Sequence, residues 1–269
     1  MTAHATFAVF MTALVTATGV AYAAGVVRLG RRGRPWRWAR TISFFLGLGL
    51  LLLGLWLPNI VHTHHDLRLH MVQHLLLGMF APLPLVLGMP GLLLLRNLPR
   101  RGVGVVMGLL VSRPLRCLTH PVTAAVSDMG AMYLLYLTPL YLLSLHNGYV
   151  HAWVHLHFIV AGYLFTWAIA GPDPAPRRPS YALRLTVLFL AAGAHAVLGK
   201  LMYAYAWPRA TGDALEDVRA AAQWMYYGGD LAELLLAILL FAQWRGRHAL
   251  GRGSWAFSMG SRRSVANLR

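Results

Sequence analysis

Histidine is the residue type in this sequence that most clearly offers chemistry, because imidazole nitrogens bind transition metals and exchange protons near neutral pH. The chain has 13 histidines among 269 residues. His70 with His74, and His151 with His155, are spaced four residues apart, which places both rings of a pair on one helix face. Met71 adds a soft thioether, a ligand type that favours copper(I). The sequence therefore predicts a histidine-rich site suited to a transition metal.

Seven apolar stretches have the length needed to cross a bilayer, whose core takes about 20 helical residues. The predicted spans cover residues 5–27, 41–59, 69–90, 120–145, 150–171, 184–206 and 219–244. The chain is 12% charged, whereas a soluble domain is about 25% charged. We therefore predict an all-α, polytopic membrane helix bundle with seven transmembrane helices over residues 1–244, followed by a basic cytoplasmic tail over residues 245–269.

Some local features bear on these spans. The first apolar stretch resembles a signal peptide, but no basic region precedes it and it has the length of a full span, so we expect a retained helix. The stretch from Gly102 to Ser112 is too short to cross, and we expect it at the membrane interface or against the bundle. Pro82 and Pro84 lack backbone donors and should kink span three.

Lysine and arginine are distributed unevenly between the two sides of the predicted bundle. Twenty of the 24 lie between spans one and two, three and four, or five and six, or after span seven. The positive-inside rule therefore places the amino terminus outside and the carboxyl terminus in the cytoplasm. Because the net charge of +16 follows the loops and not one polar face, we expect membrane lipids, and no nucleic acid, as partners.

This topology gathers ten histidines in the external layer of the membrane. A polar ring inside a bilayer is costly unless something binds it, so the histidines within the spans are the main candidates for function. The candidate metal ligands are His70, His74, His155, His157, His195 and Met71. The peripheral candidates are His62, His64, His65, His146 and His151. The loop histidines from 62 to 65 fit a simple polar loop equally well.

Charged side chains share the layer of the histidines. Lys200 follows His195 by five residues, and Asp230 and Glu233 lie one turn apart in span seven. Either carboxylate could accept the second ring N–H of a metal-bound histidine and fix its tautomer. Both could equally pair with Lys200, and the sequence leaves these alternatives open.

The sequence holds no motif that predicts catalysis. It has no phosphate-binding glycine loop, no HExxH motif and no Ser–His–acid set. Cys117 is the one cysteine, which excludes an intramolecular disulfide and a metal site built from several thiolates. We therefore expect a binding protein and not an enzyme.

Three motifs occur in order along the chain. The first is His70-Met71-Val72-Gln73-His74-Leu75-Leu76-Leu77-Gly78-Met79, followed by Ala81-Pro82 and Leu85-Val86-Leu87-Gly88. The second is His155-Leu156-His157-Phe158, running on to Ala161-Gly162-Tyr163-Leu164-Phe165-Thr166-Trp167 and Gly171-Pro172-Asp173-Pro174. The third is His195-Ala196-Val197-Leu198-Gly199. Together they resemble the signature of the CtaG family of cytochrome c oxidase assembly factors, from about span two onward.

The resemblance implies a multi-pass protein of the bacterial plasma membrane that helps copper reach the catalytic subunit of a haem–copper oxidase, its expected partner. The site residues that it carries over are His70, Met71, His74, His155, His157 and His195, with Asp230 and Glu233 as secondary positions. Many members of the family have a histidine shortly before the Pro-Leu-Tyr of span four. This chain reads Tyr136-Leu137-Thr138-Pro139-Leu140-Tyr141 there, so span four lacks one potential ligand.

Two other functions stay open on the sequence. Histidines on facing helices would also hold haem in a membrane electron-transfer protein. A transporter for metal ions or protons would need polar groups along a continuous path through the membrane. Asp128 and His120 are the candidates for such a path in the inner half.

Overall fold

The computed structural model describes residues 3–61, 66–175 and 178–265, with side chains for residues 6–57, 66–175 and 178–245. The described elements are α1 (Ala3–Arg31), α2 (Trp38–Val61), α3 (Leu67–His74), the π-helix η1 (Leu75–Phe80), α4 (Pro82–Leu87), α5 (Pro90–Asn97), α6 (Arg100–Val111), α7 (Arg113–Leu118), α8 (Pro121–Leu137), α9 (Leu140–His146), α10 (Gly148–Ala170), α11 (Tyr181–Tyr205) and α12 (Leu215–Val265).

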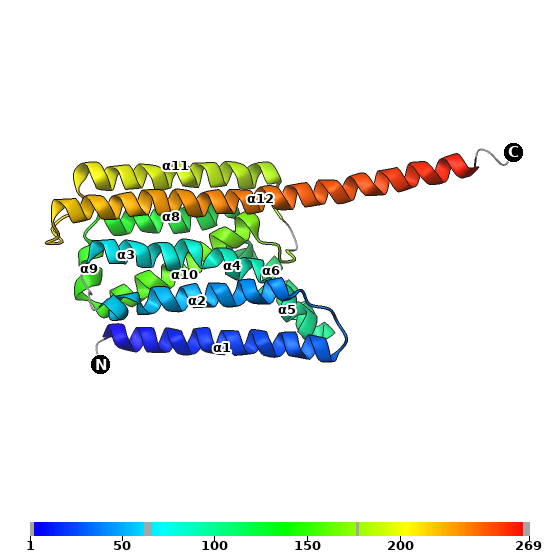
Figure 1. Cartoon of the computed structure of the whole chain (residues 1–269), viewed down its shortest axis with the longest axis horizontal. Coiled ribbons are helices and arrows are strands. Elements are labelled where there is room, and N and C mark those ends of the chain that lie inside the picture. Colours follow the sequence, from blue (N-terminus) through cyan, green and yellow to red (C-terminus); the bar gives the residue numbers. More distant parts are fainter. Residues whose placement is uncertain (1–2, 62–65, 176–177, 266–269) are drawn as a thin grey trace.

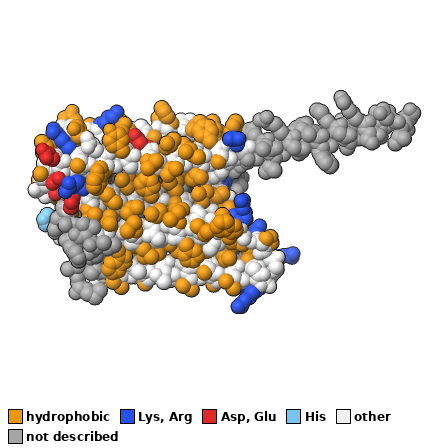
Figure 2. Space-filling view, viewed as in Figure 1, with side chains coloured by type: hydrophobic (Ala, Val, Ile, Leu, Met, Phe, Trp, Pro, Cys, Tyr) orange, Lys and Arg blue, Asp and Glu red, His pale blue; other side chains and the backbone are white. Residues whose placement is uncertain are grey.

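The long helices form one bundle (Figure 1). α1 and α2 pack together at one edge, α11 and α12 pack together at the opposite edge, and α3, α8 and α10 lie between them. We call the end at which α1 begins the amino-terminal end. The opposite end, where the connections between α1 and α2 and between α10 and α11 lie, is the arginine-rich end. Hydrophobic side chains cover the flank between the two ends (Figure 2), as expected of a surface that faces lipid.

The predicted membrane spans are confirmed, with one change to span four. Among the described residues, six segments are long and apolar enough to cross a membrane, and a bent helix pair makes a seventh if it is counted as one span. That pair is α8 and α9, which meet at 78°. Pro139 has no N–H and disfavours a helical conformation at Thr138, whose φ of −128° and ψ of 172° are extended. The helix therefore ends at Leu137, and α9 starts in a new direction.

Span three accommodates its prolines through a π-helical turn and stays continuous from Leu67 to Leu87. The Ala81 N–H donates to the Leu76 carbonyl, 2.9 Å away and five residues back, which is π-helical pairing. Pro82 cannot donate to the carbonyl of Gly78, four residues before it. That carbonyl lies against α10: a Cβ atom built on Gly162 would sit 1.9 Å from the Gly78 oxygen. Glycine at position 162 therefore lets span three and α10 approach backbone to backbone.

The first apolar stretch packs into the bundle, whereas the short stretch from Gly102 to Ser112 lies in the surface helix α6. α1 packs into the bundle, since the Tyr22 ring stacks on Phe44 with centroids 3.9 Å apart and its hydroxyl donates to the Gly88 carbonyl at 2.8 Å. α6 has no buried residue and lies near the arginine-rich end, which fits the interfacial position expected for residues 102–112.

The motif from Gly171 to Pro174 joins the end of α10 to the start of α5. The Asp173 carboxylate accepts the backbone N–H groups of Gly91, at 3.2 Å, and Leu92, at 2.8 Å. These are donors of the first turn of α5, which have no partner within the helix. Burial raises the pKa of the Asp173 carboxyl, and the two amide donors oppose that effect. The motif thus ends one helix and holds the start of another.

Replacing Gly162 by alanine tests the close contact between span three and α10. The added methyl group would overlap a backbone oxygen, which cannot swing aside as a flexible side chain can. We expect Gly162→Ala to lower the free energy of unfolding by about 1–3 kcal/mol or more, as overpacked sites do. Thermal unfolding in detergent measures the change. Gly130→Ala is the matched control, because its Cβ would meet no atom within 4 Å; equal stability of the two variants would contradict the contact.

Candidate functional site

Four buried histidines from three helices form a row inside the bundle. His70 and His74 come from α3, His155 from α10 and His195 from α11, and each side chain is at most 8% exposed. The ring centroids of His70 and His155 lie 5.8 Å apart. His74 lies within electrostatic range of His155 and His195. A helix rises by about 1.5 Å per residue, so the four histidines lie roughly 5–15 Å along their helices from the amino-terminal end of the bundle.

Most ring nitrogens of this row lack hydrogen-bond partners among the described residues. These atoms are His70 Nε2, His74 Nδ1, His74 Nε2, His195 Nδ1 and His195 Nε2. A buried polar atom without a partner costs about 1–3 kcal/mol, so native proteins rarely keep several together without a reason. Imidazole nitrogens that carry lone pairs are metal ligands and proton acceptors. The arrangement can therefore bind a cation that has lost its hydration shell.

His155 is oriented by its own helix. Its Nδ1 lies 2.9 Å from the carbonyl oxygen of His151, one turn earlier on α10. A carbonyl can only accept, so Nδ1 carries the proton of a neutral ring and Nε2 carries the lone pair. The ring centroids of His151 and His155 lie 4.1 Å apart. The peripheral candidate His151 thus adjoins the row through its backbone and its ring.

Glu233 on α12 is the acidic neighbour of the row. Its Oε1 lies 3.9 Å from His195 Nδ1, which is ion-pair distance but too long for a hydrogen bond. Glycine makes this approach possible: a Cβ atom built on Gly229 would lie 1.8 Å from Cε1 of His195. The His195 ring therefore rests on the bare backbone of α12, one turn before the carboxylate. Glu233 thus lies beside a histidine, and the role of its carboxylate toward a metal-bound ring stays a prediction.

Aromatic side chains enclose the row, and two of them come from the broken span four. The ring of Tyr141 on α9 lies 5.0 Å from that of His70, and Tyr136 lies 6.1 and 6.2 Å from His70 and His74. Phe158 lies 4.5 Å from His74. Sequence reasoning gave these tyrosines no role. The available signal was Pro139, since a helix that breaks there can fold its next turn over the bundle end.

Two of the other predicted site residues, His157 and His146, turn away from the row. His157 turns to α8, where its Nε2 is 3.1 Å from the Ser127 carbonyl oxygen. His146 is exposed and bonds to the Leu142 carbonyl of its own helix at 2.8 Å. Met71 is buried in the main hydrophobic core, and its role as a ligand stays a prediction. His62, His64 and His65 lie outside the described residues.

The remaining charged candidates, Lys200 and Asp230, are both exposed on the flank of the bundle. The Lys200 ammonium sits 5.7 Å from the Tyr226 ring. Five residues of helix turn Lys200 well away from His195, so neither side chain belongs to the buried row. Within the described residues, no three histidine, cysteine or acidic side chains converge closely enough to hold a metal ion. The row is thus a set of potential ligands and not a closed metal centre.

Comparisons with known proteins agree with this architecture. The family model described as cytochrome c oxidase caa3 assembly factor matches residues 20–247. An uncharacterised protein of Mycobacterium bovis is 39% identical over 197 residues, which are 69% of this chain and 30% of that protein. An uncharacterised protein of Mycobacterium leprae is 32% identical over 249 residues, 84% of this chain and 37% of that protein. The chain thus spans well under half the length of these relatives. No solved structure matches it.

The family match covers every helix that contributes to the histidine row. Together with the apolar spans and the mycobacterial relatives, it identifies a multi-pass protein of the bacterial plasma membrane. The chain belongs to the family of caa3-type cytochrome c oxidase assembly factors, the CtaG family.

Proposed function

We propose that this chain helps to assemble a haem–copper oxidase by holding copper(I) at the buried histidine row and passing it to the oxidase. The observation that carries the proposal is the set of buried imidazole nitrogens without partners on His70, His74 and His195. Copper(I) is a soft ion that imidazole and thioether ligands suit. It is the cargo of the protein in this proposal, and the chain itself performs no catalysis.

The open arrangement suits a protein that releases its cargo. A structural metal site closes its coordination shell, whereas a site with exchangeable metal keeps positions open. The four histidines come from three helices, so small movements of those helices bring ligands together or separate them. Glu233 supplies the negative charge that a cation needs in a low-dielectric interior. The Glu233 carboxylate beside His195 also has the position to orient that ring when its other nitrogen binds metal.

The copper site lies near the external face if the arginine-rich end is cytoplasmic, as the positive-inside rule requires. We propose this orientation for the chain. Copper would then enter and leave the row at the amino-terminal end, beside α9 and Tyr141. The catalytic subunit of the oxidase is the proposed recipient, in keeping with the assembly role of the family.

A metal or proton transporter is the second candidate, and one observation favours it. Asp128 is buried in α8 and lies within electrostatic range of Glu233, so polar groups continue from the histidine row toward the middle of the bundle. Uptake of copper or protons into proteoliposomes separates the two functions. An assembly factor binds copper without carrying it across the vesicle membrane, whereas a transporter accumulates it.

Removing the paired histidines of α3 tests the copper site. We expect His70→Ala/His74→Ala to lower copper(I) affinity at least about tenfold, because two ligands are lost at once. Titration of purified protein against a competing chelator measures the change. His146→Ala is the control, since that exposed ring lies outside the row. Full copper binding by the double variant, together with normal oxidase assembly in cells, would rule out the site.

Gly229→Ala tests the contribution of His195 without removing a ligand. The new methyl group would occupy the position of the His195 ring and force it away from Glu233. We expect copper(I) affinity to fall several-fold while the helix content, measured by circular dichroism, is unchanged. Gly193→Ala on α11 is the matched control, because its Cβ meets no atom within 4 Å. Equal affinities for both variants would exclude His195 from the site.

The orientation is testable through Cys117, which is exposed on α7 at the arginine-rich end. We expect a membrane-impermeant maleimide to label Cys117 only after the cells are permeabilised. The matched control is Cys117→Ser/Tyr149→Cys, which moves the thiol to an exposed position at the start of α10, at the amino-terminal end. This variant should react in intact cells. The reverse labelling pattern would invert the proposed topology.

A further inference from the structure

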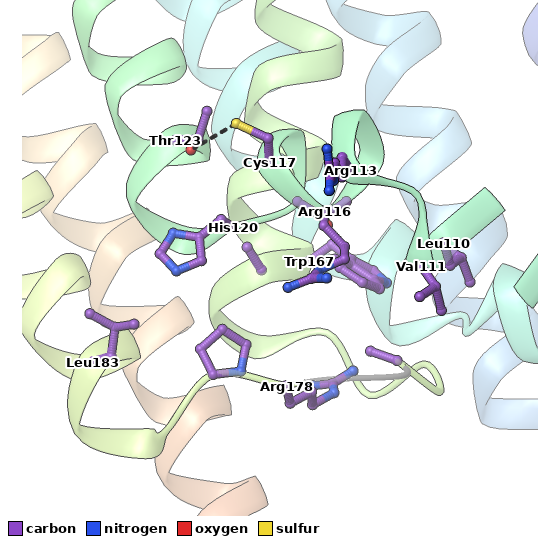
Figure 3. A pocket seen from close by; sticks show the side chains of 14 residues that line it. Leu110, Val111, Arg113, Arg116, Cys117, His120, Thr123, Trp167, Arg178 and Leu183 are labelled. Carbon is purple, nitrogen blue, oxygen red and sulfur yellow. Dashed lines mark hydrogen bonds between the residues drawn. The ribbon is translucent and has the colours of Figure 1, made fainter. Parts of the chain in front are cut away.

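A cavity lies at the arginine-rich end, far from the histidine row. Its volume is about 680 Å³, and its walls come from α7, the start of α8, the end of α10 and the start of α11. Figure 3 shows the side chains that line it. Leu110 and Val111 at the end of α6 also line it, and neither α6 nor α7 has a buried residue. It therefore lies where the apolar belt of the bundle meets the basic loops.

The polar lining of this cavity is basic. Figure 3 shows Arg113 and Arg116 on one side of the Trp167 ring and Arg178 on the other. The Arg178 guanidinium lies 5.9 Å from the Trp167 ring and donates to the Asp173 carbonyl, two contacts that fix its position. His120 and Thr123 add further polar groups to the wall. Guanidinium groups from separate elements around one hollow are the arrangement that recognises phosphate.

The charges of Arg113 and Arg116 are not neutralised by the part of the chain that the structure describes, where no carboxylate lies within 4.0 Å of either guanidinium. The nearby Asp173 carboxylate is engaged by the amides of Gly91 and Leu92. Arg113 and Arg116 are exposed. Two such cations with Arg178 create a field that favours an anion in the cavity.

The rest of the lining is apolar and continues into the surface that faces lipid. Leu110, Val111 and Leu183 line the cavity. On the adjoining helices, Leu109 and Leu118 are 58% and 50% exposed. A free phosphate or a nucleotide gains nothing from such a surface, whereas acyl chains do. The combination of arginines and adjoining apolar side chains therefore selects an amphiphile.

We propose that this cavity binds the phosphate-bearing head group of an anionic phospholipid. The phosphate lies among Arg113, Arg116 and Arg178, and the acyl chains run over the exposed leucines of α6 and α7. Basic pockets between transmembrane helices bind anionic head groups in this way. The bound lipid fixes α6 and α7 against the bundle, which these helices do not achieve by burying their own side chains.

Lipid binding by delipidated protein in detergent tests the proposal. Phosphatidylglycerol is the anionic probe, phosphatidylcholine the zwitterionic probe, and inorganic phosphate the soluble anion, with native mass spectrometry and thermal shift as readouts. We expect Arg113→Gln/Arg116→Gln to bind phosphatidylglycerol at least about tenfold more weakly. Arg31→Gln/Arg32→Gln removes the same charge from the same end of the bundle outside the cavity. This control should bind like the unmodified protein.

Three results would overturn the proposal. The first is equal loss of phosphatidylglycerol binding in the cavity variant and the control, which would indicate attraction by net charge alone. The second is equal binding of phosphatidylcholine and phosphatidylglycerol. The third is stabilisation by inorganic phosphate as strong as that by phosphatidylglycerol, which would assign the cavity to a soluble anion. Arg113→Lys/Arg116→Lys keeps both positive charges and should retain most of the lipid binding. Such retention would show that the glutamine variant loses lipid binding because its charges are gone and not because it is misfolded.

Discussion

A polar ring buried in a membrane bundle needs a partner, and this requirement governs the centre of the structure. Five nitrogens of His70, His74 and His195 lie without hydrogen-bond partners among the described residues, in an interior from which the bilayer excludes water. Each such atom costs about 1–3 kcal/mol. The surrounding packing must therefore hold the helices in place against that cost. A cation that takes the one lone pair of each neutral ring would remove the part of that cost that belongs to the accepting nitrogens.

Backbone contacts at glycine supply the packing that holds the row. Gly162 lets α10 meet the Gly78 carbonyl of span three, and Gly229 lets α12 receive the His195 ring. Both contacts lie on helices that carry the site, so the same close approaches bring three ligand-bearing helices and Glu233 together. Pro82 and Pro139 act on the backbone in a related way. Pro82 begins α4 directly after the π-helical turn that contains Gly78. Pro139 ends α8, so that Tyr141 reaches His70.

The sequence predicts the spans well because bilayer thickness fixes their length and apolar residues mark their extent. It also places His70 and His74 on one face, since their spacing alone decides that. The partners of that face are decided by helix packing, which no local pattern encodes, so Tyr136 and Tyr141 were missed. The position of His157 could have been anticipated. Two residues rotate a helix by about 200°, so His155 and His157 cannot face the same site. The orientation of the chain in the membrane stays a prediction.

The most direct measurement of the central claim is the X-ray absorption spectrum of the protein loaded with copper(I). Extended fine structure distinguishes imidazole nitrogen from sulfur and counts the nearest ligands. We expect a low-coordinate copper(I) centre dominated by imidazole scattering, with at most one sulfur ligand from Met71. A spectrum dominated by sulfur, or by oxygen from solvent with no imidazole, would contradict copper binding at the buried histidine row.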